Sequence, residues 1–392
     1  MRITVAKIRQ KAKEWCKLHY RLLPVTICKD YAVKHHLPYT AIIPEKEVPV
    51  TPVRYCGEPQ RDDVSGTLPE RYMAVLKNVE IIGASNVIIG NNSIVYDLLA
   101  TKKETYNITD IGLFRVLNSP VHFGKKYVTC YQNKGVNIEK GLYLAGNFSS
   151  NYYHFIYEIL VKWYLIDQMN VPQDVPIIVD VSAHNIPQFK ELLSLFSKGR
   201  NIIYINKLEL IKVATLYYPS MVNFIPPNLK KMEYLTTEDV VFDLNAIRYL
   251  RNKFLDYMGV PQKKTPKKFF ISRKSSKWRQ YNEKEVIEVV LSKGYEVVYP
   301  ETMTAKEQFG LFNQADEIVA ASGAAFANII CCKPHTKILI LVSVRVDGAI
   351  YSTIAKALDL QLEYLVGSIT NYNNVQSDFI IDSEKLREAL EI

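Results

Sequence analysis

Several short motifs with well-defined chemistry are missing from this chain of 392 residues. It has no C-x-x-C pair, which argues against a zinc ribbon or a thioredoxin-type site. It has no H-E-x-x-H, no G-x-S-x-G and no P-loop, which argues against a zinc peptidase, an α/β-hydrolase and a common nucleotide triphosphatase. The absence of G-x-G-x-x-G removes support for a nicotinamide cofactor.

Long apolar runs and cysteines are also scarce. No stretch of about 18 apolar residues is present, so the sequence predicts no membrane-spanning helix. The first residues lack the uninterrupted apolar core of a signal peptide. The 6 cysteines are scattered, which is typical of reduced thiols in a cytosolic protein. We therefore expect a cytoplasmic location.

Positive charge, in contrast, is in excess, with 49 Lys and Arg against 40 Asp and Glu. That balance favours an anionic partner, such as nucleic acid, a membrane surface or a phosphorylated substrate. Residues 1–23 have the periodicity of a basic amphipathic helix, with Trp15, Leu18 and Leu22 on the apolar arc. Two interpretations remain open, a helix on the inner face of an anionic membrane and a helix packed on the domain.

The order of the predicted elements indicates an α/β protein. Residues 73–145 alternate apolar and polar side chains, which predicts short β-strands, and from residue 147 helices and strands follow each other. The last third alternates strictly between apolar strands and helices, which predicts a doubly wound parallel sheet. We expect an N-terminal lobe over residues 1–240 and a C-terminal lobe over 241–392.

Ligands of such sheets bind where the strands end, so the residues after each strand deserve most weight. One strand is followed by a segment that holds Arg273 and Arg279 among further lysines and serines. Guanidinium groups and hydroxyls suit a diphosphate, whereas the alternative is a solvated basic turn.

A second strand is followed by small residues that begin a helix. They are Ser322, Gly323, Ala324 and Ala325. Small side chains let the backbone approach a ligand, and a helix N-terminus offers free N–H groups to a phosphate. Close packing of the helix on its strand is the alternative.

The third feature is His154 with Glu158, which share a face if the segment is helical. A histidine and a carboxylate can act as a general base, although such a pair is also common as a structural contact. The chain contains no D-x-D triplet, the motif with which many nucleotide-sugar enzymes hold a divalent ion. The cationic segment could neutralise a diphosphate instead.

Three blocks of sequence resemble glycosyltransferase family 61, which includes bacterial capsular polysaccharide enzymes and eukaryotic O-linked sugar transferases. They are N-Y-Y-H-F-x-x-E at 151–158, F-F-I-S-R followed by Arg279, Asn282 and Glu283, and Glu307-Gln308 with Ser322 to Ala325 and Asn328. Family members often carry histidine where this chain has Ser322.

The resemblance implies a GT-B-type fold, in which two Rossmann-like lobes enclose a cleft. It implies an inverting, metal-independent hexosyl- or pentosyltransferase that needs no cofactor and uses a nucleotide sugar, with a UDP-sugar as the expected donor. Glu158 is then the expected base, with His154 orienting it, and the reverse assignment stays open. The nucleotide sugar would contact the binding residues named above: Arg273, Arg279, Ser322, Gly323, Ala324, Ala325 and Asn328.

The expected partners are a nucleotide-sugar donor and a saccharide or lipid-linked glycan acceptor, in bacterial capsular or surface polysaccharide assembly. A catalytically inactive sugar- or nucleotide-binding protein of the same fold is the main alternative. A nucleic-acid-binding protein would interleave cations with aromatics on one element, a pattern that this chain lacks. A phosphotransferase would need a metal site, and the sequence suggests none.

Overall fold

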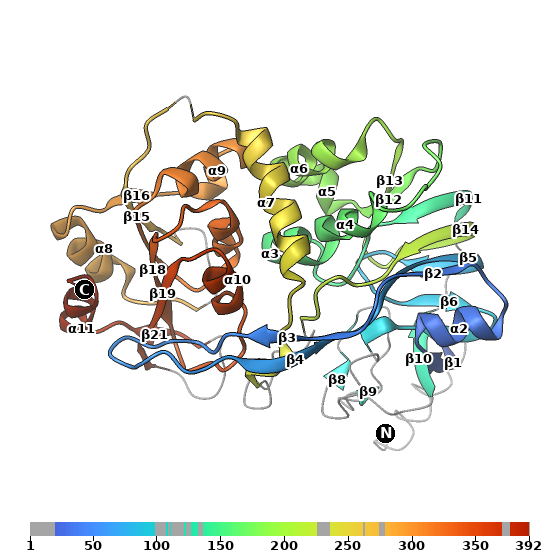
Figure 1. The fold of residues 1–392 in the computed structure, drawn as a ribbon, viewed down its shortest axis with the longest axis horizontal. Helices are drawn as coiled ribbons and strands as arrows, with labels where there is room; N and C mark the ends of the chain where they lie inside the picture. Colours follow the sequence, from blue (N-terminus) through green and yellow to red (C-terminus); the bar gives the residue numbers. More distant parts are fainter. Residues whose placement is uncertain are drawn as a thin grey trace, which may run out of the picture.

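The computed structural model describes residues 20–98, 107–108, 110, 121–122, 127–131, 136–225, 236–261, 263–273, 279–370 and 377–391. Two β-sheets lie toward opposite ends of the molecule, and helix α7 (Leu244–Met258) stands between them (Figure 1). The predicted α/β class, with parallel strands and a β-rich N-terminal part, is confirmed.

Among the described residues, ten strands form one mixed sheet in the N-terminal part, in the order β10-β1-β7-β6-β5-β14-β11-β12-β13, with β2 paired to β5. Their bounds are β1 Tyr20–Thr26, β2 Tyr39–Ile43, β5 Arg71–Ile82, β6 Ile88–Gly90, β7 Ser93–Val95, β10 Tyr127–Tyr131, β11 Val136–Tyr143, β12 Ile177–Asp180, β13 Ile202–Ile205 and β14 Leu210–Pro219. Strands β14, β11, β12 and β13 run parallel, whereas β5 is antiparallel to β14. Parallel strands here place several carboxyl ends at one edge.

Local chemistry explains the β-rich part. Strands β6 and β7 form a hairpin whose turn residues Asn91 and Asn92 both have positive φ, 43° and 56°. Asparagine tolerates that left-handed conformation better than most side chains, so it suits a tight turn between strands. Short helix α2 (Cys28–Lys34) follows β1, and the short strands β8 (Asn107–Ile108) and β9 (Val121–His122) pair with each other.

The predicted helix over residues 1–23 is wrong at its C-terminal end. Residues 20–23 belong to β1, which pairs with β10 and β7, and residues 1–19 lie outside the described residues. Pro24 gives a local reason, because the residue before a proline is disfavoured in a helix. Strand pairing then overrides the helical periodicity of the preceding residues.

The helix expected after residue 150 forms, but it is irregular. It begins with α3 (Tyr152–His154), continues as a π-helical turn (Phe155–Ile159) and a 3₁₀ turn (Leu160–Lys162), and ends as α4 (Trp163–Ile166). Asn151 caps it, since its side chain accepts a hydrogen bond from the Tyr153 N–H at 2.9 Å. Helices α5 (Ser182–Asn185) and α6 (Pro187–Ser197) separate β12 from β13.

The C-terminal sheet is parallel throughout and has the order β16-β15-β17-β18-β19. Its strands are β15 Lys268–Ile271, β16 Glu296–Val298, β17 Glu317–Ala321, β18 Lys337–Val342 and β19 Gln361–Val366. Helices and turns connect them, namely α8 Glu283–Ser292, the 3₁₀ turn Pro300–Thr302, α9 Ala305–Gln314, the 3₁₀ helix η7 Ala324–Cys331 and α10 Ser352–Ala357. The predicted strands and helices are therefore confirmed, except that η7 is a 3₁₀ rather than an α-helix.

Both faces of this sheet are covered. Phe269 and Ile271 pack in the large core shared with α7, α9 and η7, whereas Phe270 packs with α8 and with α11 (Ser383–Ala389) on the other face. Alternate residues of a strand point to opposite faces, so an apolar strand is needed wherever both faces are covered. The short strands β20 (Ser368–Ile369) and β21 (Phe379–Ile380) lie beside α11.

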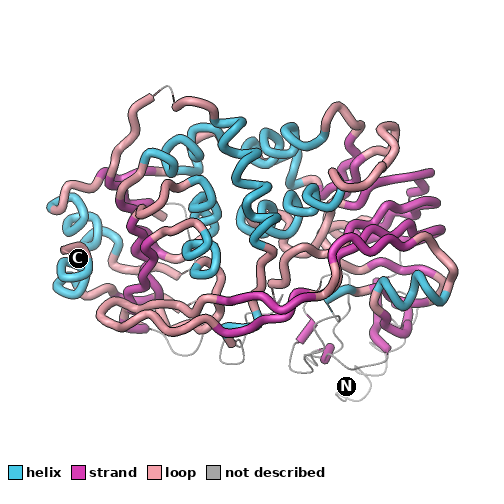
Figure 2. Tube along the Cα trace, in the orientation of Figure 1, coloured by secondary structure: helices cyan, strands magenta, loops and turns pink. Residues whose placement is uncertain are grey.

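A long excursion from the N-terminal sheet reaches the C-terminal sheet. We call residues 44–70 the arm; it contains the hairpin β3 (Lys46–Val50) and β4 (Val64–Leu68) and the loop between them. Figures 1 and 2 show it running along one side of the molecule between the two sheets. Its loop pairs with β19 through a parallel bridge between Tyr55 and Tyr364. The arm thus connects the two sheets.

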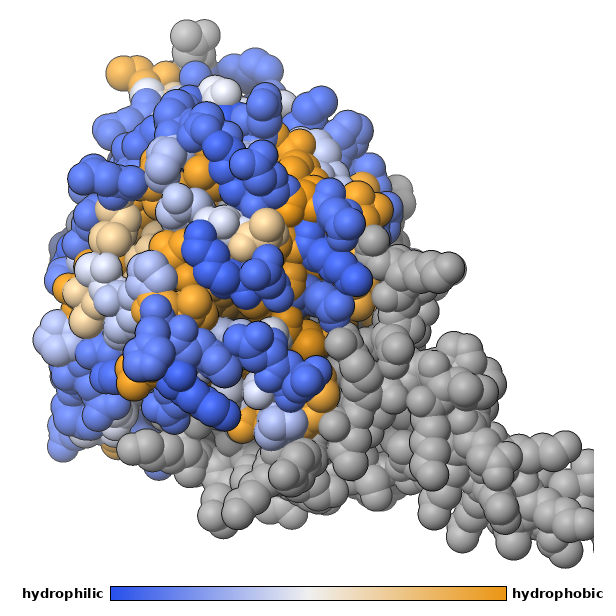
Figure 3. Space-filling model, turned by 90° about the vertical axis from the view of Figure 1, so that its right-hand side faces the viewer, coloured by the Kyte–Doolittle hydropathy of each residue, from blue (hydrophilic) through white to orange (hydrophobic). Residues whose placement is uncertain are grey.

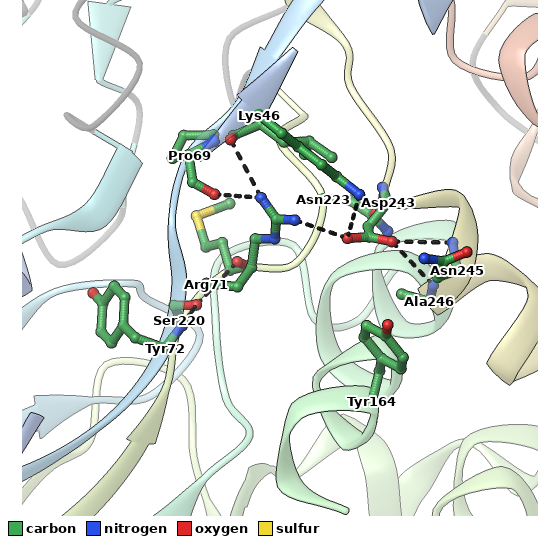
Figure 4. Close-up of polar contacts among 12 residues, drawn as sticks. Lys46, Pro69, Arg71, Tyr72, Tyr164, Ser220, Asn223, Asp243, Asn245 and Ala246 are labelled. Carbon is green, nitrogen blue, oxygen red and sulfur yellow. Dashed lines mark hydrogen bonds and ion pairs between the residues drawn. The ribbon is translucent and has the colours of Figure 1, made fainter. Parts of the chain in front are cut away.

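A buried ion pair fixes the base of the arm. Arg71, which begins β5, donates to Asp243 at 3.0 Å, and both side chains are almost fully buried (Figure 4). Arg71 also donates to the carbonyls of Leu68 and Pro69, at 3.2 and 2.6 Å. Asp243 in turn caps α7, and Lys46 lies 3.7 Å from it. The arm, β5 and α7 therefore meet at one point.

The end of the molecule at the right of Figure 1 is shown face-on in Figure 3. Hydrophobic side chains lie scattered between hydrophilic ones there. Within the described ranges, no helix has both the length and the apolar character required to cross a bilayer.

Candidate functional site

The strand order of the C-terminal sheet reverses between β15 and β17, which are neighbours. Chain connections leave the sheet in opposite directions at such a point, and a crevice opens at the carboxyl ends of the two strands. A cavity of about 470 Å³ lies there. It is lined from the C-terminal sheet by Ile271, Ser272, Arg273, Arg279, Ala320, Ala321, Gly323, Ala324 and Ala325, and from the N-terminal part by Ser150, Asn151 and Tyr152. Its size suits a small-molecule ligand.

The two predicted arginines meet in this cavity, and both are only partly exposed. Burial lowers the pKa of Arg273, although Tyr281 and Glu283 counteract this effect. Burial also lowers the pKa of Arg279 to about 10, and repulsion by Arg273 adds to that effect. Within the described part of the chain, no carboxylate offsets the lowered pKa of Arg279, and its Nε has no hydrogen-bond partner. An anionic ligand would relieve this desolvated positive charge.

Backbone geometry supports the placement of the arginines. Glu283 accepts a hydrogen bond from the backbone N–H of Arg273 at 2.7 Å and another from the Tyr281 hydroxyl at 3.1 Å. Arg279 has a φ of 53°, a left-handed conformation that is uncommon for a residue with a long side chain. Such strain is typical of functional sites. The predicted lysines at 274 and 277 lie outside the described residues.

The small residues after β17 form the other wall. Gly323 has extended backbone and directly precedes η7, and Gly323, Ala324 and Ala325 line the large cavity. Ser322 lines a second, smaller cavity that also touches both arginines. The first N–H groups of a helix have no acceptor within it, so those of Ala324 and Ala325 are available to an anion by position.

Asn328 is placed differently from the other predicted binding residues. It is fully buried and lines neither cavity. Its side chain donates to Gln308 Oε1 at 2.8 Å and accepts from the Tyr152 hydroxyl at 2.9 Å. It thereby joins η7, α9 and α3, which favours a structural role for Asn328 over direct ligand contact.

His154 and Glu158 form the predicted pair. Their Nδ1 and Oε1 atoms lie 2.7 Å apart, and both side chains are mostly buried, at 17% and 13% exposed. The pair does not line the described cavities, but it follows Asn151 and Tyr152, which do. The exposed ring of Phe148 lies 5.1 Å from the His154 ring, and Phe148 has a left-handed φ of 60°. The pair is thus formed on the N-terminal side, next to the cavity-lining segment.

A buried lysine, one helical turn after Glu158, escaped the sequence analysis. Lys162 is 5% exposed and lies 5.3 Å from the centre of the Tyr143 ring. Burial lowers its pKa to about 8, while the charges of Glu158, Asp97 and Asp180 raise it in part. The sequence gave no sign that Lys162 is buried. A lysine on the apolar face of a helix has the same pattern when its charged end extends to the solvent.

Asp180, at the carboxyl end of β12, is the acid that could replace Glu158 as a base. It is buried, and it accepts hydrogen bonds from the N–H groups of Ala84 at 2.5 Å and Gly146 at 3.1 Å. Burial raises its pKa. Since both oxygens already bind backbone N–H groups, Asp180 is a structural clamp. Across the described ranges, no group of three or more His, Cys, Asp or Glu side chains gathers in a metal-binding arrangement.

Tyr351 was also missed. It lies after β18, lines the smaller cavity, and donates its hydroxyl to the Gly323 carbonyl at 2.9 Å. Ligands of parallel sheets bind where the strands end, and this rule selected residues 272–279 and 321–325. It applies equally to the end of β18, so it could have identified the region of Tyr351.

Residues 152–339 match the family described as Glycosyltransferase 61. This match supports membership of the chain in glycosyltransferase family 61. The matched part contains His154, Glu158, both arginines and the whole wall after β17, so the family region and the site coincide. No curated protein matches the chain. Membership in family 61 indicates a glycosyltransferase, which binds a donor sugar and a glycan acceptor.

Proposed function

We propose that this family 61 protein is an inverting, metal-independent glycosyltransferase that moves a sugar from a UDP-sugar to a glycan hydroxyl. The observation that carries the proposal is the pair Arg273 and Arg279, half-buried at the switch point of a parallel sheet and facing a cavity of about 470 Å³. The two guanidinium groups suit the negative charge and the oxygen acceptors of a diphosphate.

The two sheets correspond to the two lobes of a GT-B-type enzyme in this proposal. The donor binds at the C-terminal sheet, and the acceptor enters from the side of His154 and Glu158. Tyr152 and Asn151 line the same cavity as the arginines, so the segment that carries the pair reaches the donor site. We assign the activity to bacterial capsular or surface polysaccharide assembly, on the basis of the sequence resemblance.

The proposed reaction is a single displacement at the anomeric carbon. The acceptor oxygen forms a bond to that carbon while the bond to the UDP oxygen breaks, so the configuration inverts. Glu158 takes the proton of the acceptor hydroxyl, and His154 orients its carboxylate through the 2.7 Å contact. Negative charge grows on the leaving diphosphate, where the two guanidinium groups stabilise it.

Calorimetric titration with UDP tests the proposal. We expect Arg273→Ala and Arg279→Ala each to weaken binding by roughly 10- to 100-fold, since a charge-assisted hydrogen bond contributes about 1.5–3 kcal/mol. The Arg279 variant should stay folded, because it removes a desolvated cation. Wild-type affinity in both variants would exclude the arginines from the donor site. Persistence of sugar transfer in EDTA checks the metal-independent part.

A further inference from the structure

We propose that Tyr55, on the arm, is a positioning residue for the donor site, through the loop that follows β18. The proposal rests on the proposed function, because it assumes that a nucleotide diphosphate binds at Arg273 and Arg279. It goes further by assigning part of the donor affinity to a segment that precedes the family 61 region by about a hundred residues.

The loop after β18 closes the smaller cavity. That cavity has a volume of about 90 Å³ and shares Arg273 and Arg279 with the larger one, so the arginines stand between the two. Val344, Val346, Gly348 and Ile350 contribute its loop wall. A ligand bound by both arginines therefore lies next to this loop.

Tyr55 holds the loop through two hydrogen bonds. Its hydroxyl donates to the Val346 carbonyl at 2.8 Å and accepts from the Val346 N–H at 2.7 Å. The side chain is 5% exposed and Val346 is partly exposed, so both bonds are partly shielded from water. Both backbone groups of Val346 are satisfied by a single side chain from a distant part of the sequence.

Arg345 adds a second contact between the loop and the arm. Its guanidinium lies 4.1 Å from the centre of the Tyr55 ring, at a distance typical of a cation–π contact. The same group donates to both carboxylate oxygens of Glu58 at 2.7 Å. The exposed ion pair is weaker than the partly shielded hydrogen bonds, because solvent screens it.

The arm itself is firmly attached, so it can act as a fixed support. Cys56 donates its N–H to the Tyr364 carbonyl at 3.0 Å, and Tyr364 donates to the Arg54 carbonyl at 2.9 Å. Residues 54–56 thus extend the edge of the C-terminal sheet beyond β19. At the other end of the arm loop, Lys356 pairs with Asp63 at 2.9 Å.

A loop that is already held in place loses little conformational entropy when a ligand binds against it. Without Tyr55, the donor would have to order the loop at the expense of binding energy. The arm therefore preorganises the donor site, although neither Tyr55 nor any other arm residue needs to touch the nucleotide.

The test compares Tyr55→Phe with the wild type. The substitution keeps the ring and removes both hydrogen bonds to Val346. We expect UDP to bind about 5- to 10-fold more weakly, as the loss of one to two hydrogen bonds implies, and kcat at saturating donor to stay unchanged. Amide exchange at residues 343–348 should accelerate even without ligand. Tyr249→Phe is the matched control, since the hydroxyl of Tyr249, on α7, donates a hydrogen bond to Asp167 at 2.7 Å, away from the donor site.

The outcomes separate the two proposals. A wild-type chain that binds no nucleotide diphosphate would overturn the proposed function. Wild-type UDP affinity in Tyr55→Phe, with faster exchange in the loop, would overturn this inference and leave the donor site intact. If Tyr55→Phe does not fold, Arg345→Gln takes its place in the test. We expect this variant to bind UDP about 3-fold more weakly. Unchanged UDP affinity in Arg345→Gln would overturn the inference equally.

Discussion

At the residue scale, Arg279 and Lys162 both hold positive charge away from water, but their neighbours differ. Lys162 lies near Glu158, Asp97 and Asp180, so the protein itself supplies negative charge. Arg279 has another cation beside it, and no described carboxylate offsets its lowered pKa. The lysine is therefore compensated within the fold, whereas the diphosphate of the proposed donor would compensate the arginine.

Glu158→Gln tests the proposed base. The amide cannot take a proton from the acceptor, so we expect kcat to fall by about 10²- to 10⁴-fold while the affinity for UDP changes little. Steady-state kinetics with calorimetry measures both quantities. His154→Gln is the companion variant, and a wild-type kcat in a folded Glu158→Gln protein would transfer the role of base to His154.

Lys162 predicts a pH dependence of stability. Its pKa is about 8 in the folded protein and about 10.4 in an unfolded chain. Between these values the unfolded state binds more protons, so the contribution of Lys162 to the free energy of unfolding rises with pH. Urea unfolding of wild type and Lys162→Met at pH 7.5 and 9.5 should show the difference between them change by about 2 kcal/mol in favour of the wild type.

Taking the difference removes the titration of other groups, such as the buried thiols, which is the same in both proteins. Lys198→Met, at an exposed lysine, is the control for the replacement of a lysine by methionine. A constant difference for Lys162→Met would mean that the buried lysine titrates normally.

At the element scale, the C-terminal strands could be predicted because each is a short apolar run followed by a helix. Phe269 to Ile271 must be apolar on both faces, since helices cover both. The strand-end rule then located Arg273, Arg279 and residues 322–325 without knowledge of the contacts. Strand β1 could not be predicted, because its pairing partner β10 lies about a hundred residues away and leaves no local trace.

Side-chain networks between elements were equally hidden. Asn328 has the same place in the sequence pattern whether it contacts a ligand or another helix, and only the fold brings Tyr152 and Gln308 to it. The support that Tyr55 gives to the loop after β18 has no sequence pattern either, because it depends on how the arm crosses the molecule.

Asn328→Leu tests the role of that network. The change leaves the Tyr152 hydroxyl and Gln308 Oε1 without their partner, so we expect the free energy of unfolding to fall by about 2–3 kcal/mol. Tyr152→Phe removes one of the two bonds and should cost about 1 kcal/mol. Urea unfolding measures both. Unchanged stability of Asn328→Leu together with weaker UDP binding would indicate a direct ligand contact instead.

At the scale of the whole molecule, the two sheets share one core. A single cluster of buried residues includes Leu142 and Ile177 from the N-terminal sheet and Ile318 and Ile340 from the C-terminal sheet. The arm and α7 add further connections, and both are joined to β5 by the pair Arg71 and Asp243 (Figure 4). Two lobes with separate cores would unfold separately, whereas this arrangement predicts one cooperative transition.

Arg71→Met tests this coupling. It leaves the buried Asp243 with Lys46 at 3.7 Å as its remaining cationic neighbour, so we expect a loss of about 3 kcal/mol. Amide exchange at increasing urea concentration follows β14 and β18 in the same sample. Both strands should lose protection at the same urea concentration, and Arg71→Met should shift both to the same extent, although only β14 lies in the sheet that contains Arg71.

Lys46→Met serves as the control, because it removes the partly exposed cation of the cluster and keeps the buried pair. An exposed pair contributes about 0–1 kcal/mol, so this variant should unfold close to the wild type. If Arg71→Met lowers the protection of β14 while β18 keeps that of the wild type, the two sheets are separate folding units. The arm would then join two independent lobes, and its hold on the loop after β18 would depend only on its local contacts at β19.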